Sequence, residues 1–437
     1  MPDRSHRETS FTSMNASHRS FGARLAEFRE QRFGLFIHWG LYALAARHEW
    51  VKQRERLTDE RYRVYFEQFA PDLFDPDAWA EAAGDAGMRY MVLTTKHHDG
   101  FCLWDSALTD YCVTGTPYGK DLVGPIVSAF RAKGLGVGFY HSLIDWHHPD
   151  FPIDGLHPAY AEGVSNEGRD ITKYADYLHG QVEELLTRYG PIDTMWFDFS
   201  YSARRRGGKL TPGGKGRADW RSEELVALVR RLQPGALIND RLEVPGDFVT
   251  PEQYQPAGPV GEVWEACQTL NGSWGYDRDN LDWKPVDLLV RMLVDTVSKD
   301  GNLLLNVGPN GRGEFEPGAL ATLRGIGEWM RLHGRSIYGA GPSAYQAPPD
   351  CRYTQAGDRL YVHLFSWPYR HLHLPGLAGR VRYAQLLNDA SEIRTLIPDP
   401  SVDSGHTRLS ALPDGTLTLQ LPVRRPDVAV PVIELFL

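Results

Sequence analysis

Histidine, tryptophan and carboxylate side chains gather where short apolar runs end in this 437-residue sequence. The clearest case is residues 91–106, MVLTTKHHDGFCLWDS, in which a β-prone run leads into His97, His98 and Asp99. Such a cluster could ligate a metal, form a solvated loop, or bind a polar small molecule in a pocket. Imidazole suits the last task because it donates and accepts hydrogen bonds in fixed directions.

A metal site at residues 97–99 fits the spacing poorly. Neighbouring strand residues point to opposite faces unless the strand has ended or bulged, and no further Cys, Asp or His follows at ligand spacing. We therefore expect neither a metal nor another cofactor, and we interpret the histidines as part of a pocket for a polar small molecule.

Polar and aromatic residues recur at the ends of the other apolar runs. They are His38 and Trp39, Tyr140 and His141, Trp196 and Asp198, Asp240 and Arg241, and Glu265. If the runs are parallel strands of one barrel, their carboxyl ends meet at one mouth and these side chains share a cavity. So many polar residues in register favour a functional site over a structural role for each.

Seven apolar runs alternate with helical stretches, which is typical of a parallel sheet covered by helices. The runs span residues 33–40, 90–98, 136–143, 194–200, 236–240, 262–270 and 302–309. A (β/α)₈ TIM-like barrel is favoured over a doubly wound sheet, because the first run ends in FIHWGLY and not in a glycine-rich phosphate turn. The eighth strand is expected near residues 336–340.

The pattern changes after residue 342, which predicts a second domain. Short alternating runs and tight turns replace helices there, and DGTLTLQLP places Leu417, Leu419 and Leu421 on one strand face. We predict a (β/α)₈-like barrel domain over residues 19–342 and a β-sandwich over residues 343–437. Residues 1–18 lack periodicity and are expected to be disordered or loosely packed.

Composition narrows the class of protein. The formal net charge of -9 arises from 56 acidic and 47 basic residues spread along the chain, so no nucleic-acid partner is expected. No apolar run resembles a signal core or approaches the roughly 18 residues of a membrane span. We therefore expect a cytoplasmic protein without a membrane partner, and a homo-oligomer is compatible with the sequence.

Several segments, in this order along the chain, resemble the α-L-fucosidase family, glycoside hydrolase family 29. They are RFGLFIHWGLYALAARHEW, YMVLTTKHHDGFCLWDS, GFYHSLIDW, IDTMWFDFS, INDR with GDFVTPEQ, WEACQTLNGSWGY, and GNLLLNVGPNGRG with IGEWMRLHGRSIYG. Together they cover about residues 30–340. The resemblance implies a metal-free retaining exo-glycosidase that releases terminal α-L-fucose from fucosylated glycans, with a catalytic barrel followed by a β-sandwich.

The same resemblance assigns the two catalytic carboxylates. Asp198, in the Trp196-Phe197-Asp198 motif, matches the nucleophile, which forms a glycosyl-enzyme ester. Glu252, in GDFVTPEQ, resembles the acid/base. Glu265 is the alternative acid, and it could instead pair with Arg241 to hold the pocket together. For retention the two carboxyl groups must come within about 5 to 5.5 Å.

The remaining assignments concern the sugar. His38, Glu49, His97 and His98 match family residues that bind fucose hydroxyls. Trp50 and Trp274 correspond to aromatic positions around the sugar, and Trp196 lies beside the nucleophile. Tyr140 and His141 occupy the place of a family Tyr pair, which leaves open which of the two faces the sugar. Arg241 matches an arginine near the nucleophile, where its charge would keep Asp198 ionised.

Two other functions fit the same pattern of residues. One is a related exo-glycosidase acting on a galactoside-like sugar of the same hydroxyl configuration, and the other is a carbohydrate-binding barrel without catalysis. The presence of Asp198 argues against the second. The basic, glycine-rich segment at residues 201–220 could be a subsite loop or a solvated insertion.

Overall fold

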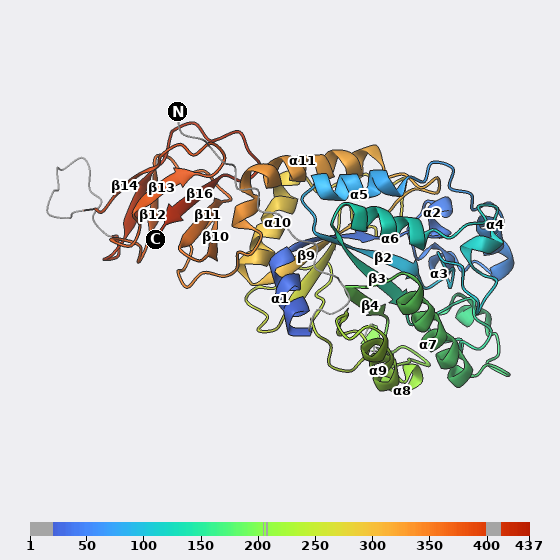
Figure 1. The fold of residues 1–437 in the computed structure, drawn as a ribbon. Helices are drawn as coiled ribbons and strands as arrows, with labels where there is room; N and C mark the ends of the chain where they lie inside the picture. The colour runs from blue at the N-terminus through green and yellow to red at the C-terminus, as the bar shows by residue number, and fades with distance from the viewer. Residues whose placement is uncertain (1–20, 204, 207–208, 399–411) are drawn as a thin grey trace, which may run out of the picture.

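A computed structural model describes residues 21–203, 205–206, 209–398 and 412–437 of the chain. The predicted loose segment at residues 1–18 lies outside the described residues. The first part forms a parallel sheet in the order β7-β4-β3-β2-β1-β9-β8 (Figure 1). Its strands are β1 (Phe33–Ile37), β2 (Tyr90–Lys96), β3 (Gly136–Ser142), β4 (Thr194–Asp198), β7 (Leu237–Ile238), β8 (Trp264–Thr269) and β9 (Gly301–Val307). Each predicted apolar run overlaps one of them, and β9 begins one residue before its run.

The sheet closes through a segment that the sequence pattern did not reveal. Residues 248–252 lie between β7 and β8, with parallel bridges from Phe248 to Asn239 and from Glu252 to Cys267. The prediction of an eighth strand near residues 336–340 is wrong, because a 3₁₀ turn, η4 (Gly334–Ser336), begins this stretch and a turn follows it. The closing segment has only isolated bridges, so it lacks the long alternating run that marks a strand in sequence.

Helices cover the outside of this curled sheet, as the alternating pattern predicts. In α7 (Ile171–Arg188) the stripe formed by Tyr174, Leu178, Val182 and Leu185 is buried, and Asp170 caps the first turn. The other helices are α1 (Phe21–Gln31), α2 (Tyr42–Ala45), α3 (Val51–Arg54), α4 (Asp59–Glu67), α5 (Pro76–Asp85), α6 (Val123–Ala132), α8 (Arg217–Trp220), α9 (Ser222–Leu232), α10 (Val286–Ser298) and α11 (Pro317–His333). Among the described residues, no helix combines the length and the apolar character needed to cross a bilayer.

Side chains fill the barrel interior, which makes it a packed core and not a pore. They include Phe36, Tyr90, Trp196 and Leu304, and Phe28 of α1 packs against them. Because the interior is full, a ligand can reach only the side chains at the carboxyl ends of the strands. The fold therefore places the predicted site at that mouth.

The C-terminal part consists of two antiparallel sheets, as predicted, shown in orange and red in Figure 1. Leu417, Leu419 and Leu421 are buried in their common core, which agrees with the alternation in the sequence. One sheet contains β10 (Cys351–Ala356), β11 (Arg359–Leu364), β16 (Val432–Phe436) and β13 (Tyr383–Leu386). The other contains β12 (His371–Leu374), β15 (Leu417–Gln420) and β14 (Arg394–Leu396).

Candidate active site

Asp198 is the last residue of β4, and two neighbours hold its carboxylate in place. The Tyr140 hydroxyl donates to Oδ2 at 2.8 Å, and Arg241 Nη1 donates to Oδ1 at 2.8 Å. Strand β3 supplies the tyrosine, and the segment after β7 supplies the arginine. A carboxylate fixed on two sides keeps one orientation toward the mouth, which is what a nucleophile requires.

Arg241 joins Asp198 to Glu252. Its Nη1 lies 2.8 Å from Glu252 Oε2, and Nε donates to Thr250 Oγ1 at 2.9 Å. The guanidinium also lies over the Trp196 ring, 4.7 Å from the ring centroid. Burial alone would lower the pKa of Arg241, but the charges of Asp198 and Glu252 outweigh it and raise the pKa well above its ordinary value. Arg241 is therefore a permanent cation between the two acids.

The shared nitrogen limits the separation of the acids. Since each oxygen lies 2.8 Å from Nη1, Asp198 Oδ1 and Glu252 Oε2 are at most twice that distance apart. This upper limit is compatible with the roughly 5 to 5.5 Å of retaining glycosidases and lies below the roughly 6.5 to 9.5 Å of inverting ones. The Glu252 side chain is 42% exposed and that of Asp198 only 13%. The geometry therefore suits an inner nucleophile and an outer acid with access to water.

Glu265, the alternative acid, lies below this pair in the barrel interior. Its carboxylate accepts hydrogen bonds from the Tyr90 hydroxyl and, at 2.9 Å, from Trp196 Nε1. Burial raises its pKa to about 7, a value that would suit a general acid. Its partners are core residues, however, and it does not pair with Arg241 in the structure. This position is that of a buried structural carboxyl group, so the geometry favours Glu252.

Aromatic rings and neutral histidines form a cluster beside the acids. His38 lies 5.6 Å from His97 and 5.1 Å from Trp274 between ring centroids, and His97 stacks on Tyr140 at 5.7 Å. Burial lowers the pKa of His38 to about 4 and that of His97 well below its ordinary value. Near neutral pH both rings can therefore donate and accept hydrogen bonds, which suits sugar hydroxyls.

Glu49 is buried near the same cluster and holds the loop that carries Trp274. Its Oε2 accepts the N–H of Gly275 at 2.8 Å. Burial favours the protonated form, but the ring of His48 and the Gly275 N–H outweigh it and lower the pKa of Glu49 to about 2. A Cβ at position 275 would lie 2.8 Å from the Tyr42 ring, so only glycine allows this close approach. Glu49 is therefore an ionised acceptor.

Trp50 and His98 form a second wall of the mouth. Their ring centroids are 5.1 Å apart, and the His98 Nδ1 lies 2.7 Å from Ser142 Oγ. Trp146 and Phe199 complete this wall, at 5.1 and 5.3 Å from Trp50. Phe199 directly follows the nucleophile and has a φ of 82°, a strained value for a residue with a side chain.

His141 does not lie in the pocket, which corrects the prediction for this residue. Its Nδ1 lies 3.3 Å from Thr95 Oγ1, and its ring is 5.8 Å from that of Trp104. Successive residues of β3 point to opposite faces, and Tyr140 occupies the inner one. The open choice between the two residues is thus settled by strand alternation in favour of Tyr140.

Sequence reasoning missed Trp146, Phe199 and Asn306. Trp146 and Phe199 each follow a strand end, where the same rule that selected their neighbours would have found them. Asn306 lies inside the apolar run NLLLNVGP, and a buried amide in such a run is itself a signal, since it needs hydrogen-bond partners. Its partners are His38 and the Trp274 carbonyl.

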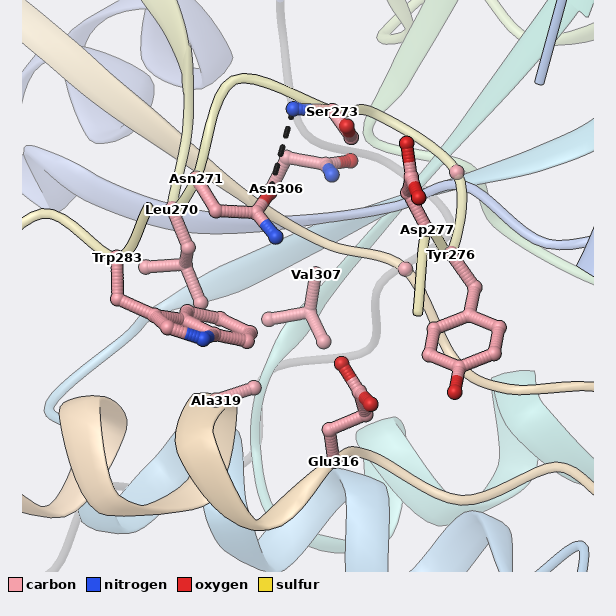
Figure 2. A pocket seen from close by; sticks show the side chains of 12 residues that line it. Leu270, Asn271, Ser273, Tyr276, Asp277, Trp283, Asn306, Val307, Glu316 and Ala319 are labelled. Carbon is pink, nitrogen blue, oxygen red and sulfur yellow. Dashed lines mark hydrogen bonds between the residues drawn. The ribbon is translucent and has the colours of Figure 1, made fainter. Parts of the chain in front are cut away.

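A pocket lies beside the loop after β8 that carries Trp274 (Figure 2). It is lined by that loop, the end of β9 and the start of α11, including Trp283, Val307 and Glu316. Neither predicted catalytic carboxylate borders it, so it backs the wall of the site and is separate from the acids. Across the described part of the chain, no group of three or more His, Cys, Asp or Glu is arranged to hold a metal ion.

Comparisons with known proteins agree with this geometry. A family model described as Alpha-L-fucosidase matches residues 3–335. Tissue alpha-L-fucosidase of Rattus norvegicus is 30% identical over 373 residues, which cover 78% of this chain and 76% of that protein. The structure of alpha-L-fucosidase isoenzyme 1 from Paenibacillus thiaminolyticus is 46% identical, with a TM-score of 0.86, and the match covers 95% of this chain and 99% of that one.

A second solved structure bears on the mechanism. It is a GH29 alpha-L-fucosidase from Bacteroides thetaiotaomicron, described as a trapped covalent intermediate with 2-fluoro-fucosyl fluoride. It is 27% identical, has a TM-score of 0.80, and the match covers 97% of each chain. This chain therefore belongs to the α-L-fucosidase family, glycoside hydrolase family 29.

Proposed function

We propose that this protein is a retaining α-L-fucosidase that removes terminal α-L-fucose from fucosylated glycans by double displacement. The observation that carries the proposal is the single Arg241 nitrogen that contacts both Asp198 and Glu252 at the barrel mouth. Two carboxyl groups that share one nitrogen lie closer together than the roughly 6.5 to 9.5 Å of inverting enzymes, as the retaining mechanism requires. The related proteins named as α-L-fucosidases support the choice of sugar.

In the first step Asp198 attacks the anomeric carbon while Glu252 protonates the leaving oxygen. The C–O bond to the aglycone breaks, and an ester forms between fucose and Asp198. Arg241 and the hydroxyl of Tyr140 hold the carboxylate of the nucleophile in position before attack. The outer, half-exposed position of Glu252 lets it reach the leaving group.

In the second step Glu252 acts as base. It removes a proton from a water molecule that attacks the anomeric carbon, and Asp198 leaves as the carboxylate. Two inversions give net retention of configuration. The neutral histidines and ionised Glu49 bind the hydroxyls during both steps, and the rings of Trp50 and Trp274 cover apolar parts of the sugar.

Azide rescue tests this assignment. Asp198→Gly is expected to lower kcat by about 10³-fold or more, and azide should then react in a single displacement to give the inverted β-L-fucosyl azide. Glu252→Ala on an aryl fucoside should instead give the retained α-L-fucosyl azide, because its nucleophile is intact. NMR identifies the two anomers.

Other outcomes of the azide experiment would overturn the proposal. Full activity of the Asp198→Gly variant removes the nucleophile assignment. An inverted azide product from the Glu252→Ala variant contradicts the double displacement. An aryl galactoside of matching configuration serves as a second substrate, and faster turnover of it than of the fucoside would replace fucose by the galactoside-like alternative.

A further inference from the structure

Asn306 of β9 connects two predicted sugar contacts that come from different elements. It is 1% exposed, and its Oδ1 lies 2.6 Å from His38 Nδ1. Its Nδ2 donates to the backbone carbonyl of Trp274 at 2.6 Å. Both ends of one buried amide are therefore used by residues of the pocket wall, and Figure 2 shows Asn306 beneath the loop after β8.

These contacts fix the position of one proton on His38. A backbone carbonyl can only accept, so the amide group that faces the Trp274 carbonyl must be the NH₂ of Asn306. The oxygen of the same amide then faces His38, and it also can only accept. His38 Nδ1 must therefore carry a proton and donate it to Asn306. Because the Trp274 carbonyl and Asn306 Oδ1 both accept, a neutral His38 ring must carry its proton on Nδ1.

The second nitrogen of His38 is then an acceptor. Burial lowers the pKa of His38 to about 4, against the opposing charges of Glu49 and Asp198, so the ring is neutral near pH 7. A neutral imidazole with its proton on Nδ1 has a lone pair on Nε2. In the described part of the chain no residue hydrogen-bonds Nε2, while the ring lies among those of His97, Tyr140 and Trp274.

We propose that Asn306 is a positioning residue that fixes the Nδ1–H tautomer of His38, so that a fucose hydroxyl must donate its proton to Nε2. The site thereby selects a sugar by the direction of a hydrogen bond and not only by the presence of oxygen. The identity of the sugar rests on the proposed function. The tautomer itself follows from the contacts of Asn306 alone.

The tautomer can be measured on the full chain. Protein with ¹⁵N-labelled histidine is studied near pH 7, and the His38 signals are assigned by their loss in His38→Gln. We expect a protonated, pyrrole-like Nδ1 and a pyridine-like Nε2. A proton on Nε2 would overturn the proposal. This readout needs no turnover, so it stands or falls separately from the fucosidase assignment.

Variants of Asn306 show whether the amide is the cause. Asn306→Asp replaces the NH₂ by an acceptor and adds a negative charge beside Nδ1, so the pKa of His38 should rise. Asn306→Leu removes the acceptor, and both tautomers of His38 should then be populated. Asn302→Ala is the matched control, because Asn302 is a buried amide of the same strand that donates to the Phe28 carbonyl. It should leave the His38 signals unchanged, and a tautomer shift in the control alone would contradict the proposal.

Sugar analogues test the consequence for recognition. Fucoses with hydrogen or fluorine in place of one hydroxyl are compared as competitive inhibitors, since fluorine cannot donate. At the hydroxyl that meets His38, both replacements should weaken binding by about tenfold, and equally. In Asn306→Asp, at a pH below the raised pKa of His38 where Nε2 is protonated, the fluorinated sugar should bind more tightly than the deoxy sugar. If, in the unsubstituted protein, fluorine restored the binding lost by the deoxy sugar at every hydroxyl position, no hydroxyl would need to donate. That result would refute the proposed direction of the hydrogen bond to His38.

Discussion

At the scale of single residues, the charge state of an acid does not by itself identify its role. Burial raises the pKa of Glu265 to about 7, which is the kind of shift expected of a general acid. Its hydrogen bonds, however, come from Tyr90 and Trp196 inside the barrel. Glu252 has the better place for an acid/base, because only its carboxylate shares Arg241 with Asp198. Geometry therefore favours Glu252 over Glu265, a choice that the sequence left open.

The pKa of Glu265 predicts how stability depends on pH. A carboxyl group that titrates near 7 when folded and near 4.5 when unfolded binds more protons in the folded state between these values. Glu265 therefore contributes its full share to the free energy of unfolding below about pH 4.5. That share, up to about 3 kcal/mol, is lost as the pH rises through 7. Glu265→Gln should remove this loss and be more stable than the parent at pH 8, as measured by calorimetry.

The buried histidines provide the check on this comparison. Burial lowers the pKa of His38, His157 and His333 to about 4, so their contribution to stability is lost as the pH falls below about 6.5. The parent and the Glu265→Gln variant both lose this stability at low pH. The difference between their plots of unfolding free energy against pH therefore reports on Glu265 alone. Parallel curves from pH 4 to 8 would contradict the raised pKa of Glu265, and loss of turnover in the variant would contradict a purely structural role.

At the scale of elements, an irregularity in β2 decides which side chains enter the pocket. Thr94 pairs with Tyr140, but Lys96 pairs with His141 on the outer face, so the alternation slips by one residue. Simple alternation from Tyr90 would have turned Lys96 inward and His97 outward. The slip instead allows His97 to stack on Tyr140. The strand was predictable from its apolar run, whereas the bulge leaves no mark in a pattern of period two.

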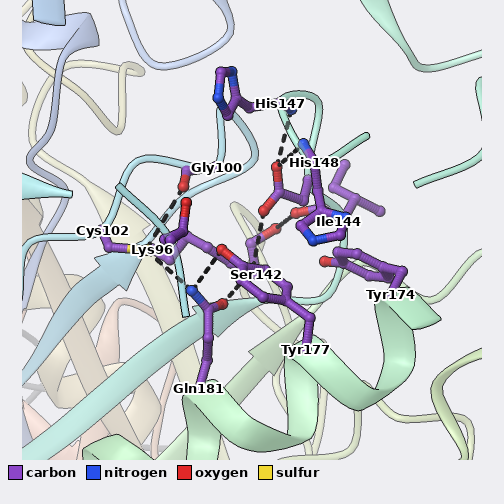
Figure 3. A network of polar contacts seen from close by, with 12 residues as sticks. Lys96, Gly100, Cys102, Ser142, Ile144, His147, His148, Tyr174, Tyr177 and Gln181 are labelled. Atoms are coloured by element: carbon purple, nitrogen blue, oxygen red, sulfur yellow. Dashed lines mark hydrogen bonds and ion pairs between the residues drawn. The ribbon is translucent and has the colours of Figure 1, made fainter. Parts of the chain in front are cut away.

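The bulge also buries a charge behind the site (Figure 3). Lys96 Nζ lies 3.3 Å from Asp145 Oδ2 and 2.9 Å from Gln181 Oε1. Asp145 Oδ1 accepts the N–H groups of His147 and His148, each at 2.9 Å, and so shapes the loop after β3. The neighbouring N–H of Trp146 donates to the His98 carbonyl. Lys96 is thereby linked to the wall of the mouth without touching it.

Breaking this pair should cost much of the stability of the barrel. Lys96→Met leaves Asp145 buried without its counter-charge, and we expect a loss of about 3 to 5 kcal/mol in the free energy of unfolding. Denaturant unfolding followed by circular dichroism measures it. Lys133→Met, at an exposed helix end, is the matched control and should change stability by less than about 0.5 kcal/mol. Equal stability of the two variants would show that the buried pair is dispensable.

At the scale of the whole molecule, the two predicted domains share apolar packing. Val430 and Val432 of the C-terminal part belong to the same buried cluster as Trp329 of α11. Trp329 Nε1 donates to the Val430 carbonyl at 2.8 Å, and Arg335 forms an ion pair with Glu434 at 2.7 Å. The change of sequence pattern near residue 342 predicted two architectures. It could not predict this contact, because periodicity shows which face of a helix is apolar but not what covers it.

The shared packing predicts coupled unfolding. The full chain should unfold in one calorimetric transition, with circular dichroism and activity lost together. Trp329→Ala should lower stability by about 3 to 5 kcal/mol, since it removes a large buried side chain and leaves a cavity. Leu332→Ala, at a more exposed position of the same helix, is the control and should change much less. Two well-separated transitions in the unmodified chain would contradict the coupling.

Labelling of the nucleophile tests the central claim most directly. In 2-deoxy-2-fluoro-α-L-fucosyl fluoride, the C2 fluorine slows both steps while the fluoride leaving group speeds the first, so the covalent intermediate should accumulate. Mass spectrometry of the digested protein should find the fluorofucosyl group on the peptide that contains Asp198, and specifically on that carboxylate. An inactivated protein labelled at another residue, or turnover of the reagent without any covalent adduct, would contradict the double-displacement account.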